Sequence, residues 1–155
     1  MSVSASGTLA PTNEVEVGSE LSGIIEQVSV DVNDRVRKGQ VLARLDTAKL
    51  QDAVVRSEAN LAAAEAQVQQ ARATVAEARS NLARLKHVAE LSGGKVPAKS
   101  ELDTAEATLQ RSVAAEASAE ASVAQNRAAL KSDRTNLAKA SILSPIDGVV
   151  LARKV

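Results

Sequence analysis

The chain has 155 residues and a formal net charge of zero, from 19 basic and 19 acidic residues, and it contains no Phe, Tyr, Trp or Cys. The absence of cysteine excludes a disulfide framework and thiol chemistry, and the balanced charge gives no electrostatic case for binding nucleic acid. Because aromatic side chains usually anchor a compact core, a chain without them must bury its aliphatic surface in thin layers.

Residues 1–46 are predicted to form strands. The stretch "NEVEV" alternates polar and apolar residues, "GIIEQVSVDV" is β-branched with a period of two, and "VLARL" follows as a further strand. Gly18, Gly23 and Gly39 separate these stretches and are typical of turns. We therefore interpret residues 1–46 as an N-terminal strand and the first half of a small β domain.

Residues 47–140 are predicted to form two long helices, because alanine is abundant and apolar residues recur every seven positions. The arms are expected at about 47–92 and 98–140. The tip is expected at 92–99, where "SGGKVPAK" contains the helix-ending residues Gly93, Gly94 and Pro97. At 1.5 Å per residue such a hairpin is about 65 Å long.

One antiparallel register satisfies both arms. If Val54 faces Leu137, steps of seven residues place large residues opposite large ones, and a layer of smaller residues alternates with them. This register predicts a seam that comprises Val54, Leu61, Val68, Val75, Leu82, Leu102, Leu109, Val123, Leu130 and Leu137. Glu116, opposite Val75, interrupts it, so that either Glu116 reaches out of the seam or Val113 replaces it through a local slip.

The helix starts also have candidate caps. Asp46 or Thr47 is placed to cap the first arm and Ser100 the second.

Residues 141–155 return to a strand pattern, and "DGVV" at 147–150 runs in step with "SGII" at 22–25. The predicted fold class is therefore α+β: a long antiparallel two-helix coiled coil inserted between two halves of a small β domain, the second half truncated.

The arrangement resembles the periplasmic adaptor (membrane fusion) proteins of the HlyD superfamily. The stretches that carry the resemblance are "VEVGSELSGIIEQVSVDVNDRVRKGQVLARLD" and "ASILSPIDGVV", which are similar to the two halves of a biotinyl/lipoyl-like domain. The hairpin length and the opening "SASGTLAPTNEVEVGSELSG" are most similar to the MacA-type adaptors of ABC efflux systems. The resemblance covers nearly the whole chain.

This resemblance implies an adaptor subunit that bridges an inner-membrane ABC-type transporter to an outer-membrane TolC-like channel, for the efflux of drugs, peptides or similar substrates. It implies a hexamer in the full-length protein and a location in the periplasm at the inner membrane, with the anchor outside this chain. A HlyD-like type I secretion adaptor, or an adaptor of another transporter class, is the alternative. No cofactor, metal, nucleic acid or catalytic residue is expected.

The resemblance also implies that the hairpin tip contacts the channel. MacA-type tips are expected to carry Arg, then Leu four residues on, then Ser seven further. Anchoring on Leu91 places His87 and Ala98 at the other two positions, so only the leucine matches. The predicted tip surface comprises His87, Leu91, Lys95, Ala98 and Lys99, and Lys86 adds to its basic character.

Two functions of other classes stay open from the sequence. Lys49 in "DTAKL" could carry lipoate or biotin, but its position opens a helix, whereas a modified lysine needs a hairpin turn. The arms could also form a self-associating coiled coil with no transport role. Catalysis is not expected, because Asp31, Asp34, Asp46 and Asp147 fall at predicted turns and do not converge in a pocket. His87 has no Cys or His partner for a metal.

Overall fold

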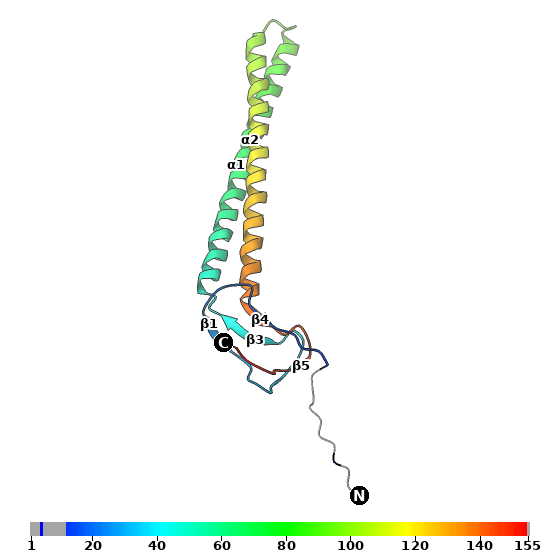
Figure 1. Cartoon of the computed structure of the whole chain (residues 1–155). Helices are drawn as coiled ribbons and strands as arrows, with labels where there is room; N and C mark the ends of the chain where they lie inside the picture. Colours follow the sequence, from blue (N-terminus) through cyan, green and yellow to red (C-terminus); the bar gives the residue numbers. More distant parts are fainter. Residues whose placement is uncertain (1–3, 5–11, 155) are drawn as a thin grey trace. The chain divides into compact units, whose positions relative to one another are not determined.

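The computed structural model describes residue 4 and residues 12–154, and within these the chain divides into two compact units. Residues 47–138 form a helical hairpin, and the described residues before 47 and after 138 form a small β unit. The predicted fold class, a two-helix hairpin inserted between two β segments, is confirmed (Figure 1).

The β unit is built from chain segments on both sides of the hairpin. Its three-stranded antiparallel sheet has the order β1 (Ile25–Val28), β3 (Val41–Leu45), β4 (Ser141–Leu143). A second, two-stranded sheet pairs β2 (Arg35–Val36) with β5 (Gly148–Val149). The segment after the hairpin therefore supplies one strand to each sheet.

Turns in this unit are fixed by backbone conformation and by side-chain oxygens. Asn33 and Gly39 have φ values of 75° and 82°, in the left-handed region that Asn and Gly tolerate. The N–H of Lys38 donates to Oδ1 of Asp147 at 2.7 Å, a contact between residues 109 positions apart. The core is small: Val36, Ala43, Leu45, Ala140 and Ser144 are its buried side chains among the described residues.

Two strand predictions in this unit are wrong in extent. "NEVEV" at 13–17 is not a strand, and its Val15 and Val17 are exposed. "GIIEQVSVDV" contributes only β1, because its register shifts between Ile25 and Gln27 and the pairing with β3 ends at Val28. Alternating polarity marks a segment suited to a sheet, but a strand also needs a partner edge. Residues 1–3, 5–11 and 155 of the predicted β segments lie outside the described residues.

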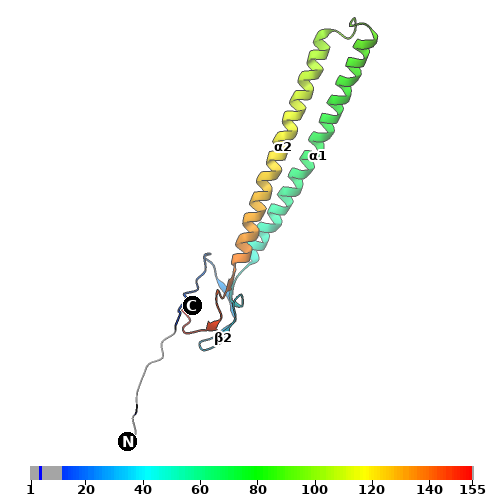
Figure 2. The same ribbon diagram turned by 90° about the vertical axis from the view of Figure 1, so that its right-hand side faces the viewer.

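The hairpin consists of α1 (Ala48–Leu91) and α2 (Lys99–Lys139), which lie side by side in both views (Figures 1 and 2). Every residue of the two predicted heptad layers is buried or half-buried, on both arms. Ser57 donates a hydrogen bond to Oδ2 of Asp133, in the small layer of the predicted register. The antiparallel register read from the heptads is thus the one the structure shows.

Glu116 shows how the seam tolerates a charge. Its side chain is 25% exposed and meets Nε of Arg72 at 3.2 Å, whereas Val113 is 44% exposed. The carboxylate therefore reaches out of the seam to a cation, and the local slip that would bury Val113 does not occur.

Two of the residues predicted as caps, Thr47 and Ser100, do not cap a helix with their side chains. Thr47 occupies the N-cap position of α1, but its side chain makes no capping hydrogen bond. Its Oγ1 instead accepts from Nε2 of Gln51 at 3.2 Å. Ser100 cannot cap α2, because that helix already begins at Lys99. Within the residues that the structure describes, neither helix has an apolar stretch of the length and hydropathy needed to cross a membrane.

Candidate functional site

One flank of the hairpin carries a row of ion pairs between the arms, here called the ion-pair ladder. Its four rungs are Glu58–Arg134, Glu65–Arg127, Arg72–Glu120 and Lys86–Glu106, with N···O distances of 2.7, 3.5, 2.8 and 2.9 Å. In the two rungs nearest the β-unit end of the hairpin the acid is on α1. In the two nearest the tip it is on α2. The ladder thus reverses sign halfway along the hairpin.

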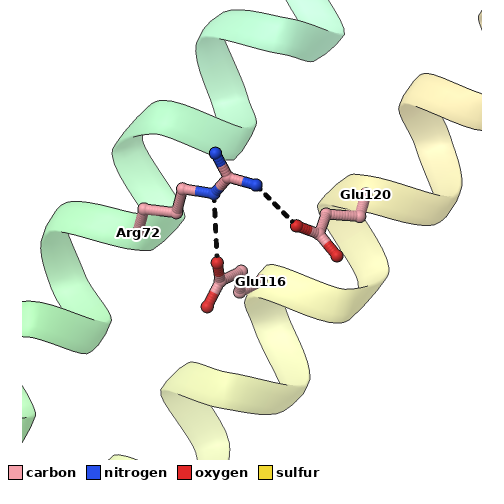
Figure 3. A network of polar contacts seen from close by, with 3 residues as sticks. All are labelled: Arg72, Glu116 and Glu120. Carbon is pink, nitrogen blue, oxygen red and sulfur yellow. Dashed lines mark hydrogen bonds and ion pairs between the residues drawn. The ribbon is translucent and has the colours of Figure 1, made fainter.

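The rung at Arg72 is part of a three-residue network (Figure 3). Arg72 donates from Nη2 to Glu120 at 2.8 Å and from Nε to Glu116 at 3.2 Å. These two hydrogen bonds, the one to Glu120 first, hold the pKa of Arg72 above its ordinary value. Because Arg72 is exposed to solvent, the network contributes little to stability through charge alone. Its structural effect is to take the Glu116 carboxylate from the seam out to water.

The ladder has a gap at one heptad position, where an acidic residue is missing and the four rungs are not continued. The heptad position between the rungs of Arg72 and Lys86 is occupied by Arg79 on α1 and by Val113 on α2. Among the described residues Arg79 has no ion pair, and Val113 is 44% exposed. The arms are therefore held by charge on both sides of this position but not at it.

A shallow groove of about 430 Å³ lies along the ladder flank. Val68 and Val123 line it from opposite arms, together with the rungs Glu65–Arg127 and Arg72–Glu120. Both valines belong to the predicted seam, so the groove is a depression over the seam with charged walls and an apolar floor.

The predicted seam residues all lie on the facing sides of the arms. Val68, Val75, Leu82 and Leu130 are buried. The remaining ones are half-buried: Val54, Leu61, Leu102, Leu109, Val123 and Leu137. This incomplete burial follows from a two-helix structure, in which each layer is open to water at both edges.

The tip is a tight connection between residues 91 and 99. Gly93 and Gly94 have φ values of 66° and 82°, which end α1, and the N–H of Gly94 donates to the carbonyl of Ala89 at 2.8 Å. The hydroxyl of Ser92 accepts the N–H of Val96 at 3.1 Å and donates to the carbonyl of Val96 at 2.7 Å. Ser92 therefore closes the loop, a role that sequence reasoning missed because a serine after a helix reads as an ordinary polar residue.

Two apolar side chains are exposed at the tip. Leu91 is 76% exposed and Val96 is 55% exposed. Val96 was not among the predicted tip residues, although an apolar residue between Lys95 and Pro97 in a polar loop is itself a signal. Together with the exposed Ala98, they give the tip an apolar surface, whereas its lysines in the sequence suggest a basic one.

The charges at the tip are fewer than the sequence suggests. Lys86 pairs with Glu106 at 2.9 Å, so it does not add free positive charge, contrary to the prediction. Lys95 and Lys99 are exposed, and no ion pair involves either of them in the described part of the chain. His87 is exposed, with Nδ1 3.9 Å from Oε2 of Glu90, and it lies one helical turn before Leu91.

The residues considered for other chemistry lie apart. Lys49 is exposed in the first turn of α1 and not in a β-hairpin turn. Over residues 12–154, no three His, Asp or Glu side chains come together in a way that could hold a metal ion. The hairpin itself is a two-helix rod with ion pairs between its arms and exposed apolar side chains at its tip.

Comparison with known proteins places this arrangement among export adaptors. Residues 13–155 match the family model described as "RND MFP, barrel-sandwich hybrid domain". The chain is 32% identical over 149 residues to the macrolide export protein MacA of Yersinia pestis, covering 96% of this chain and 39% of that protein. It is 34% identical over 151 residues to the pyoverdine export membrane fusion protein PvdR of Pseudomonas putida, covering 97% and 38%.

A solved structure agrees with these relatives. The crystal structure of MacA from Actinobacillus actinomycetemcomitans superimposes with a TM-score of 0.84 and 30% identity, covering 93% of this chain and 44% of that one. The chain therefore spans about two fifths of the length of the relatives that it matches.

Proposed function

The chain belongs to the RND membrane fusion protein family, and on that premise we propose that it serves as the periplasmic adaptor of a tripartite export pump. In this role it bridges an inner-membrane ABC-type transporter to an outer-membrane TolC-like channel. The exported substrates would be drugs, peptides or similar molecules. Relatives named for the export of macrolides and of pyoverdine support this function.

The observation that carries the proposal is the exposure of Leu91. A leucine that is 76% exposed at the end of a long helix, close in the chain to an exposed Val96, is an apolar surface without a cover. Exposed apolar patches on such elements are typical of contact sites for other proteins. We infer that Leu91 inserts between helices of the channel, while Lys95 and Lys99 contact acidic groups at its rim.

The braced rod suits the bridging role. Ion pairs and a seam along α1 and α2 keep the tip at a fixed distance from the base of the hairpin. In the full-length protein the adaptor acts as a hexamer that surrounds the conduit, at the inner membrane. Its contribution is positioning and sealing rather than chemistry.

The test is export by cells that carry variants of the gene encoding this chain. Leu91→Asp should abolish resistance to the exported compound, because a carboxylate cannot enter an apolar contact. Leu91→Met is the matched control and should retain most of it. A photo-crosslinker at Lys95 should link the wild-type adaptor to the channel. Full export by Leu91→Asp, with unchanged crosslinking, would contradict the proposal.

A second candidate concerns only the inner-membrane partner. The matching family model is described for RND systems, which favours a transporter of that class as the alternative to an ABC-type pump. A HlyD-like type I secretion adaptor is a further alternative. Co-purification of the tagged adaptor from membranes, followed by mass spectrometry of the retained transporter, separates the three.

A further inference from the structure

A pocket in the β unit lies beside β2 and carries two arginines in its lining. It has a volume of about 560 Å³, and the residues that line it are Arg35, Val36, Arg37, Gln40, Asp147 and Gly148. This volume lies in the range of roughly 300–1,000 Å³ that small-molecule sites occupy. All of the lining residues belong to the same compact unit of the chain.

Strand geometry directs both arginines to the same side of β2. Successive side chains along a strand point to opposite faces, so Arg35 and Arg37 share one face and Val36 takes the other. Val36 is 8% exposed and belongs to the small core, whereas both arginines are exposed. The two guanidinium groups therefore line the pocket from neighbouring positions on one side of the strand.

The positive charge of this pocket is not neutralised by ion pairs. In the part of the chain that the structure describes, neither arginine takes part in an ion pair, and neither does Lys38, the next residue in the chain. Asp147 is the one acid in the lining, and its Oδ1 accepts the N–H of Lys38 at 2.7 Å. Two like charges on one face repel each other, and an anion bound between them would offset that repulsion.

Hydrogen bonds fix the turn that carries the pocket. The N–H of Arg37 donates to Oε1 of Gln40, and the N–H of Gln40 donates to the carbonyl of Arg37, both at 2.9 Å. The N–H of Gly39 donates to the carbonyl of Ser144 at 2.7 Å, which ties the turn to the segment after the hairpin. Because Oε1 of Gln40 already accepts, its Nε2 group, which makes no hydrogen bond within the described residues, is left to donate to a ligand.

We propose that this pocket, here called the arginine pocket, binds a small organic anion through a carboxylate or phosphate group. The planar guanidinium fork matches both groups, since each can accept two parallel hydrogen bonds from one arginine. Gln40 supplies a further donor. The chain has no aromatic residue to stack on a ring, so the charged group is the part of the ligand that is recognised. The inference goes beyond the proposed function, because it concerns the β unit and does not depend on the hairpin tip.

Heteronuclear NMR of the isotopically labelled chain tests the proposal. Sodium phosphate and sodium citrate are added in separate titrations, with sodium chloride at equal ionic strength as the reference. Both anions should shift the amide signals of Lys38, Gly39 and Gln40 in a saturable way at about millimolar concentration. Vesicles of anionic lipid form a third titration. Equal shifts with chloride, or shifts with the vesicles alone, would overturn a site for a small soluble anion.

A matched pair of variants separates a built site from general attraction to a positive charge. Arg37→Gln should weaken phosphate binding by about fivefold to tenfold, because it removes one guanidinium fork from the pocket. Arg44→Gln removes the same charge from an exposed arginine of β3 that does not line the pocket, and should change binding by less than about twofold. Circular dichroism should show the same helix content in both variants. Equal weakening by the two substitutions would contradict the proposal.

A third variant should move the affinity in the opposite direction. Asp147→Asn removes the negative charge from the lining and keeps an oxygen to accept the N–H of Lys38, so phosphate should bind about threefold to tenfold more tightly. Unchanged or weaker binding by this variant would overturn the arginine pocket as an anion site. So would the absence of binding by the unaltered chain, which would leave the arginines as charges that keep the edge of β2 from pairing with other strands.

Discussion

Ser57 donates a hydrogen bond to Asp133 across the seam, from a residue 76 positions away in the chain. Both side chains are half-buried, and they lie in the layer of small residues near the β-unit end of the hairpin. A polar pair at this position supports only one register of the arms, because a slip would leave the Asp133 carboxylate facing alanine or leucine.

Removal of the hydroxyl alone should destabilise the hairpin. Ser57→Ala leaves the half-buried carboxylate of Asp133 without its donor, which should cost about 1–2 kcal/mol in the free energy of unfolding. The double variant with Asp133→Ala should recover most of that loss, because alanine layers already occur elsewhere in the seam. Thermal unfolding followed by circular dichroism checks both, and additive losses would argue against coupling of the two side chains.

The carboxylate of Glu116 should be dispensable. Glu116→Leu continues the leucine layer opposite Val75 and should raise the free energy of unfolding by about 1–2 kcal/mol. Arg72 keeps its hydrogen bond to Glu120 in this variant, so no buried charge is left alone. Glu116→Gln is the control, since it removes the charge without adding apolar contact. A lower melting temperature for Glu116→Leu would show that this layer is too narrow for leucine.

The incomplete rung can be completed. Val113→Glu places an acid opposite Arg79 and should stabilise the hairpin by about 0.3–1 kcal/mol at low salt, which is the usual range for an exposed pair. High salt should remove most of this gain. Val113→Gln, equally polar but uncharged, separates the charge effect from the loss of an exposed valine. Equal stability of the two variants at low salt would contradict the ladder geometry at this level.

Gly94 should tolerate asparagine better than alanine. Its φ of 82° is left-handed, and an added Cβ meets no atom within 4 Å, so only backbone strain opposes substitution. Gly94→Ala should cost about 1–2 kcal/mol, and Gly94→Asn should cost clearly less. The comparison is made by urea unfolding of the two variants. Identical midpoints would mean that the tip rearranges around the substitution.

The hairpin was predictable because the same pattern of buried large and small residues repeats every seven positions along both arms. Large and small residues at heptad positions fix both the register and the turn, and the structure places Ser57 against Asp133 as that register requires. The ladder follows from the same register, yet its rungs were not predicted. The partners of Arg72, Glu116 and Glu120, lie on the second arm of the same hairpin.

The β unit was predicted less well, for a different reason. Strand pairing depends on which edges are available and not only on local pattern, so "NEVEV" keeps its alternation without being a strand. The contact of Lys38 with Asp147 joins segments separated by the whole hairpin, and no local signal marks it. The tip roles of Ser92 and Val96 likewise depend on loop geometry that the residue types alone do not specify.

The reversal of sign halfway along the ladder constrains how such a rod can change in evolution. A deletion of seven residues in one arm would shift every rung beyond it, and rungs near the reversal would then bring like charges together. All rungs keep their opposite charges when insertions and deletions come as matched heptads in both arms, which changes the reach by about 10 Å at a time. In the proposed bridging role, the span that the hairpin covers would then change in increments of one heptad per arm.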